Sequence, residues 1–166
     1  IPFYYTYSYG DNYYTNMDAD IYNEILSGRL NVHNVTEAQT AVNKILKYEK
    51  TPDLTDTLWF INACLIANED GWTYPPPPYG DDSIYWSDVR NAKTQMLASG
   101  YNTIDTLSRL LGNNSSTVIS RVNQGRSIVM YRGCGTNTWY YPFSVDPNQT
   151  QNGNKLPIVL SFTFGT

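Results

Sequence analysis

The sequence has few charged residues and few of the side chains that most often carry out catalysis or bind metals. Lysine, arginine, aspartate and glutamate make up 16% of the 166 residues, and there are one histidine and two cysteines. Two cysteines are too few for a disulfide scaffold, and their spacing matches no zinc-binding pattern. The formal net charge of -4 and the lack of a lysine or arginine cluster argue against a nucleic-acid groove.

Long apolar runs are also missing, so the sequence predicts no membrane span. Ile1–Tyr5 has neither the basic nor the apolar region of a signal peptide. What the chain has instead is 15 tyrosines and abundant asparagine, threonine and serine. A cytosolic domain would carry about 25% charged residues, so this composition indicates an extracellular protein. The length predicts one domain over residues 1–166.

The first 27 residues show the least clear pattern of secondary structure in the sequence. Within them, Asp18, Asp20 and Glu24 have the spacing of calcium ligands, because alternate carboxylates on a curved backbone can converge on one cation. The glycine that would make the turn sharp is missing. We therefore prefer a solvated acidic loop and keep a structural calcium site as the alternative.

Apolar runs and amphipathic segments alternate after residue 35. Thr36 and Gln39 form a capping-box pattern, and Pro52 ends the helical pattern that follows. The unbroken apolar run over 58–67 is typical of a strand covered on both faces. The pattern predicts helices over 37–49 and 88–99, a third helix capped by Ser116 and ended at Gly125, and strands over 58–67, 101–107, 127–131 and 157–163.

Strands that alternate with helices predict an α/β fold, a three-layer α/β/α sandwich with a mostly parallel sheet. Residues 1–57 form a loop-rich part with the first helix, and residues 58–166 form the α/β part. In such a sheet the chemistry gathers at the carboxyl ends of the strands. No helix follows the last strand, so we expect the domain to be truncated there and to belong to a longer precursor with further domains.

A set of short motifs in fixed order resembles the gingipain-type cysteine peptidases. The resemblance covers the chain from about Asp18 to its end. The motifs are Gly28–Val32, Asn34–Glu37, Lys44 with Tyr48–Lys50, Leu65–Glu69, Asn123–Gly125 before Ile128–Tyr131, Trp139, and Leu156–Pro157.

The resemblance implies a caspase-like fold and a Cys/His dyad that needs no cofactor. The family's histidine falls on Cys134 and its nucleophilic cysteine on Phe164, so neither essential side chain is present. The only histidine, His33, precedes the first helix. We therefore predict that the chain is inactive as a cysteine peptidase, because it lacks both the nucleophile and the proton carrier at their positions.

The resemblance also suggests where a peptide would bind. Glu69 matches an acidic residue beside the family's histidine. The family's aspartate for basic specificity falls on Ser83, next to Asp82. The expected substrate-binding residues are Asp82, Ser83, Gly133, Gly135 and Trp139. As an alternative, Cys134 is itself a nucleophile with Glu69 as its base, since glycine neighbours and the nearby Arg132 favour a thiolate.

Two hypotheses for function follow. The first is a secreted bacterial peptidase domain of gingipain type, altered at its catalytic positions. The second is a peptide-binding or structural module of a bacterial surface protein that has lost the chemistry. Both imply a peptide or protein partner. A third, a nucleotide-binding domain, rests only on Gly133 and Gly135 and is weak because no third glycine follows at the required spacing.

Overall fold

A computed structural model describes Thr15, Met17, residues 24–25, Gly28 and residues 30–68, 83–135 and 137–163. The chain divides into two compact units, Ile1–Asn43 and Lys44–Thr166. The boundary between them falls inside helix α2 (Val35–Lys50). The second unit holds all four strands of the sheet.

Helix α2 begins at a cap that differs from the predicted one. The side chain of Asn34, not Thr36, accepts a hydrogen bond from the backbone N–H of Glu37 (2.9 Å). Glu37 in turn accepts one from the backbone N–H of His33 (2.8 Å), and this bond is the main reason that the pKa of Glu37 lies below its usual value. The sequence predicted that this helix would pack on the sheet. The helix forms, but none of its residues is buried.

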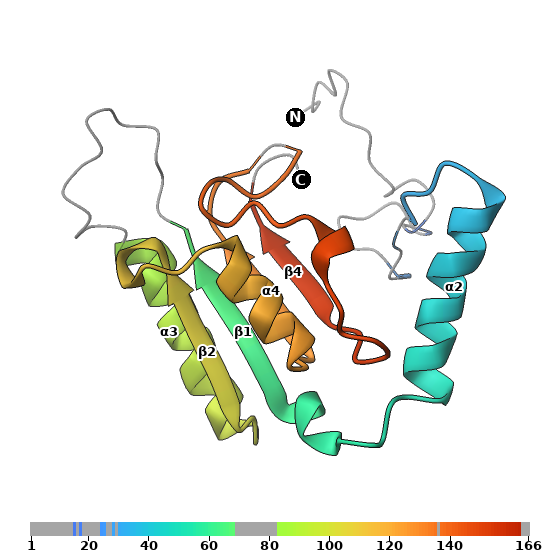
Figure 1. Cartoon of the computed structure of the whole chain (residues 1–166), viewed down its shortest axis with the longest axis horizontal. Helices are drawn as coiled ribbons and strands as arrows, with labels where there is room; N and C mark the ends of the chain where they lie inside the picture. The colour runs from blue at the N-terminus through green and yellow to red at the C-terminus, as the bar shows by residue number, and fades with distance from the viewer. Residues whose placement is uncertain are drawn as a thin grey trace. The chain divides into compact units, whose positions relative to one another are not determined.

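Four parallel strands form one sheet in the order β2-β1-β3-β4 (Figure 1). The strands are β1 (Asn62–Ala67), β2 (Thr103–Ser108), β3 (Ile128–Arg132) and β4 (Ile158–Phe162). The predicted parallel neighbours at 58–67, 127–131 and 157–163 are therefore confirmed. The first of these strands begins later than predicted, because Asp56 caps a short 3-10 helix over Thr57–Ile61.

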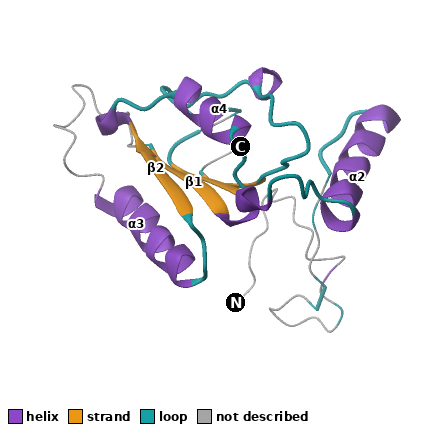
Figure 2. Ribbon diagram, turned by 60° about the horizontal axis from the view of Figure 1, so that its bottom comes forward, coloured by secondary structure: helices purple, strands orange, loops and turns teal. Residues whose placement is uncertain are grey.

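One helix covers each face of the sheet, which confirms the three-layer sandwich (Figure 2). Helix α3 (Ser83–Ala98) packs Val89 against Ala63 and Leu65 of β1. Helix α4 (Ser115–Asn123) packs Val118 and Val122 on the other face. The alternation of side chains along β1 thus fills two separate cores, because successive residues of a strand point to opposite faces.

The ends of the two covering helices also differ from the prediction. Helix α3 starts five residues before the predicted start at residue 88. The cap of α4 is Asn114, whose side chain pairs with Thr117 in a capping box, and not Ser116. Gly125 follows α4 with a φ of 91°, and a Cβ there would lie 2.8 Å from the Cβ of Trp59. Only glycine suits both demands.

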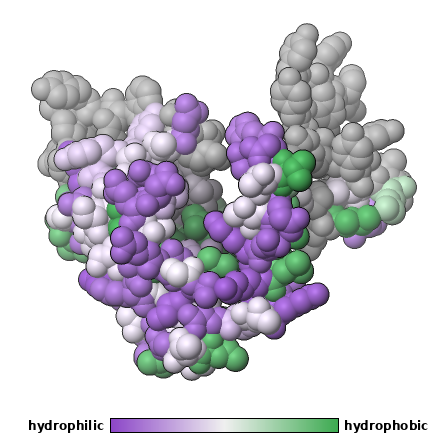
Figure 3. Space-filling model, turned by 45° about the vertical axis from the view of Figure 1, so that its right-hand side comes forward, coloured by the Kyte–Doolittle hydropathy of each residue, from purple (hydrophilic) through white to green (hydrophobic). Residues whose placement is uncertain are grey.

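None of the helices in the described residues is long and apolar enough to cross a membrane. The visible surface is mostly hydrophilic with separate apolar patches (Figure 3).

Candidate functional site at the carboxyl end of the sheet

The carboxyl ends of β1, β3 and β4 are tied together by backbone hydrogen bonds. The N–H of Asn68, directly after β1, donates to the carbonyl of Arg132 at the end of β3 (2.9 Å). The N–H of Gly133 donates to the carbonyl of Phe162 at the end of β4 (3.3 Å). Residues that lie far apart in the sequence therefore meet at the carboxyl end of the sheet, as expected for parallel strands.

The hydroxyl of Tyr131 is the centre of a buried hydrogen-bond network at this end of the sheet. It donates to the carbonyl of Cys134 (2.6 Å) and accepts from the side-chain amide of Asn68 (2.9 Å). The same amide donates to the carbonyl of Tyr140 (3.0 Å). Burial is the main cause that raises the pKa of Tyr131 to about 12, so the hydroxyl stays protonated and can donate.

The turn from Gly133 to Gly135 is packed tightly against this network. A Cβ at Gly133 would lie 2.7 Å from the ring of Tyr131 and 2.9 Å from the Cβ of Asn68, so a larger residue would force the turn outward. Cys134 is 6% exposed. Gly135 and Trp139 form an isolated antiparallel β-bridge. The indole of Trp139 stacks on the ring of Tyr131, with the ring centroids 4.4 Å apart.

Arg132 contacts different groups from those that the sequence suggested. We expected its charge to favour a thiolate at Cys134. Instead its Nε donates to Asp88 on α3 (2.9 Å), and its guanidinium lies over the ring of Tyr85, 4.1 Å from the centroid. The charge of Arg132 is thus directed at the α3 face of the sheet, since neighbouring residues of a strand point to opposite faces.

The model of peptidase family C25 matches residues 1–163. The chain belongs to peptidase family C25. This result confirms the resemblance to the gingipains that the sequence motifs showed.

Solved structures show the same fold for this C25 chain. The Arg specific cysteine proteinase gingipain R matches with a TM-score of 0.74 and 23% identity, over 92% of this chain and 35% of that one. The complex of Porphyromonas gingivalis RgpB pro- and mature domains matches with a TM-score of 0.73 and 23% identity, over 91% and 36% of the two chains. The C25 chain therefore spans about a third of the length of these structures. The comparison with curated proteins gives no match.

Several predicted site residues of the C25 chain lie outside the described residues. Ser83 is the first residue of α3, and its backbone alone is described. Glu24 accepts a hydrogen bond from the backbone N–H of Met17 (2.6 Å). Within the described ranges no three histidine, cysteine, aspartate or glutamate side chains are grouped as metal ligands. The predicted residues outside the described ranges are Asp18, Asp20, Glu69, Asp82 and Phe164.

The other cysteine, Cys64, and the only histidine, His33, lie outside this site. Cys64 is buried in β1, and burial raises the pKa of its thiol to about 12, so it stays a neutral apolar side chain. His33 is 84% exposed, and its Nδ1 lies 3.2 Å from Glu37, four residues along the chain. The sequence's only imidazole thus lies at the start of α2.

The sequence did not indicate the roles of Asn68, Tyr131 and Tyr140. Asn68 and Tyr131 are separated by 63 residues, so no local spacing could have revealed the pair. The one available signal was the position of Asn68 directly after a buried strand, where polar residues of α/β sheets gather.

Replacing Tyr131 by phenylalanine should destabilise the domain by about 2 kcal/mol, because Asn68 and the Cys134 carbonyl would each lose a buried partner. Urea unfolding followed by fluorescence measures the change. The matched control is Tyr141→Phe, since Tyr141 is largely exposed and the free energy of unfolding should hardly change. Equal effects of the two variants would show that the Tyr131 hydroxyl does not hold the turn.

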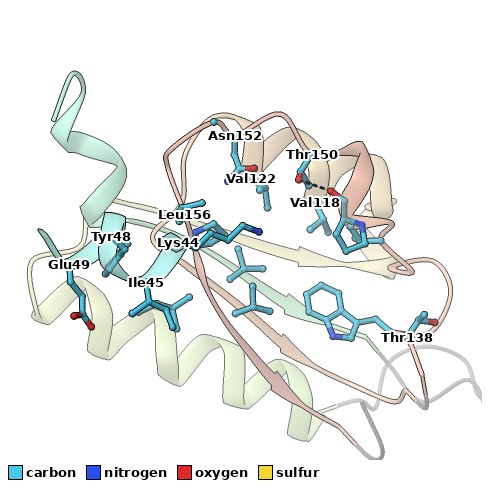
Figure 4. Close-up of a pocket in the computed structure, with 18 of the residues that line it drawn as sticks. Lys44, Ile45, Tyr48, Glu49, Val118, Val122, Thr138, Thr150, Asn152 and Leu156 are labelled. Atoms are coloured by element: carbon cyan, nitrogen blue, oxygen red, sulfur yellow. Dashed lines mark hydrogen bonds between the residues drawn. The ribbon is translucent and has the colours of Figure 1, made fainter. Parts of the chain in front are cut away.

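A second feature of the described residues is a cavity of about 870 Å³ on the α4 side of the sheet (Figure 4). It is bounded by the C-terminal half of α2, by α4, and by β3 and β4. Its apolar lining includes Ile45, Val118, Val122, Leu156 and Val159. This volume lies within the range of ligand sites in proteins.

Proposed function

We propose that this C25 domain binds polypeptide at the carboxyl end of its sheet without cleaving it through a Cys/His dyad. The observation that carries the proposal is the environment of Cys134. The sequence resemblance assigns Cys134 to the family's histidine position. Cys134 is 6% exposed, and its carbonyl accepts a hydrogen bond from the hydroxyl of Tyr131. A thiol in this place cannot act as the proton carrier near neutral pH that the dyad mechanism requires.

Loss of the second dyad member supports the same conclusion. The family's nucleophilic cysteine falls on Phe164, and a phenyl ring offers no lone pair for attack on a carbonyl. Cys64 does not replace it, because its thiol is buried within β1.

Peptide binding needs none of the missing groups. Ligands of α/β proteins bind at the carboxyl end of the sheet. The backbone of Gly133 and Gly135 lies there, and so does the ring of Trp139. The Nε1 of Trp139 donates to the hydroxyl of Ser161 near the end of β4 (2.9 Å), which fixes the indole plane. Glu69, Asp82 and Ser83 are proposed to complete the peptide site from the segment between β1 and α3.

The composition supports a secreted or cell-surface location in a bacterium. Low charge and abundant tyrosine are typical of extracellular proteins, and one matched structure comes from Porphyromonas gingivalis. In that setting the domain acts as a peptide-binding module of a surface protein.

Incubation with an unbiased peptide library, with and without iodoacetamide, tests the proposal. We expect no hydrolysis in either sample, because both dyad positions are replaced, and we expect peptide binding, measured as a change in tryptophan fluorescence, to persist. The matched control is Cys134→Ala, which should behave like the unaltered chain. Hydrolysis that iodoacetamide and Cys134→Ala both abolish would instead identify Cys134 as a nucleophile, with Glu69 as the candidate base.

A further inference from the structure

The proposed peptide site takes its residues from two stretches of the chain. One is the turn from Gly133 to Gly135, directly after β3, and the other ends at Ser83, the first residue of α3. One peptide can contact both stretches only if the scaffold holds them in a fixed relation to each other. The contacts between the end of β3 and the start of α3 therefore decide the geometry of the site.

Arg132, the last residue of β3, makes two directional contacts with α3. Its Nε donates to the Oδ2 of Asp88 (2.9 Å), and its guanidinium carbon lies 4.1 Å from the centroid of the Tyr85 ring. Tyr85 and Asp88 are three residues apart, so they share one face of the helix within its first two turns. Arg132 thus holds α3 close to the residue at which the helix begins.

The strand end that carries Arg132 is itself fixed. Its carbonyl accepts the N–H of Asn68 (2.9 Å), and in the sheet it pairs with Ala67 of β1 and Phe162 of β4. The middle of α3 is held differently, by Val89 in the apolar core. Apolar burial has no preferred direction, whereas a stacked and hydrogen-bonded guanidinium has a fixed geometry. The side chain of Arg132 therefore defines where the first turns of α3 lie.

We infer that Arg132 is a positioning residue of the peptide site, an assignment that rests on the proposed function. Through Asp88 and Tyr85 it holds the start of α3, and with it Ser83, at the distance from Gly133 that a bound peptide needs. The pair contributes little to stability, because the side chain of Asp88 is 47% exposed. Loss of the Arg132 contacts should therefore weaken peptide binding while the urea midpoint hardly changes.

The test compares Arg132→Gln with Arg90→Gln. Arg90 is an exposed arginine on the same helix, so its variant removes the same charge and leaves the contacts of Arg132 in place. The probe is the fluorescein-labelled hexapeptide that the unaltered chain selects from an unbiased library, with anisotropy for affinity. We expect Arg132→Gln to weaken binding about fivefold, from the loss of one cation–π contact and one ion pair, and Arg90→Gln to bind normally. Amide exchange over residues 87–89 should become faster only in Arg132→Gln.

A charge exchange provides the rescue. Arg132→Asp alone should bind at least as weakly as Arg132→Gln, because it places two carboxylates side by side. Adding Asp88→Arg restores an ion pair and should return the affinity to within about twofold of the unaltered chain. Unchanged affinity in Arg132→Gln, equal weakening by Arg90→Gln, or a loss of affinity explained by unfolding would each overturn the role of Arg132 alone. A library that yields no binder would overturn the proposed function and this role with it.

Discussion

Thiol-dependent peptide hydrolysis should appear when Cys134 is replaced by histidine and Phe164 by cysteine in a chain that extends beyond Thr166. These replacements restore both side chains of the dyad at the positions where the C25 resemblance places them. Loss of a nucleophile or its base costs roughly four to six orders of magnitude in rate, so the gain over the unaltered chain should be of similar order. Hydrolysis of the peptide library, with and without iodoacetamide, measures it.

The single variants Cys134→His and Phe164→Cys are the controls, and each should remain inactive because a dyad member acts only with its partner. Cys134 is largely buried, so thermal unfolding should first show that the histidine variant folds. The combination Cys134→Asn with Phe164→Cys serves as a control for side-chain size without a titratable group. A folded double variant that cleaves nothing would show that the assignment of the dyad positions is wrong.

Replacing Asp105 by alanine should lower the free energy of unfolding by about 3–5 kcal/mol. The Oδ2 of Asp105 accepts a hydrogen bond from the Nε of Arg126 (2.7 Å), and the side chain of Arg126 is only 6% exposed. The Nε of Arg121 lies 3.2 Å from Oδ1, in an ion pair without an aligned hydrogen bond. Removal of the carboxylate would leave the Arg126 charge buried and unpaired, which is why the loss is large.

Asp88→Ala is the matched control for this prediction. Asp88 also pairs with an arginine, Arg132, but its side chain is 47% exposed, so its loss should cost at most about 1 kcal/mol. Urea unfolding of both variants gives the two free energies. Equal losses would mean that water already screens the Asp105 pair, in contradiction to its burial.

The element types and their order could be predicted because they depend on local patterns. The unbroken apolar run ending at Ala67 predicted a covered parallel strand, and the structure buries that strand on both faces. The motifs were sufficient to identify the gingipain resemblance. Errors arose at the element ends, where one polar side chain decides the boundary. Asp56 and Asn114 cap the 3-10 helix and α4, and neither was predicted.

The sequence by itself determined the family and the parallel α/β sandwich. Only the tertiary structure decided what surrounds Cys134, because Asn68 and Tyr131 meet across 63 residues of chain. It also directed Arg132 toward Asp88, since that contact depends on which face of β3 each residue occupies. The spacing of apolar residues along the sequence shows whether a segment forms a helix or a strand. The partner of a buried polar group depends on how the elements pack, and those contacts form only when the sheet assembles.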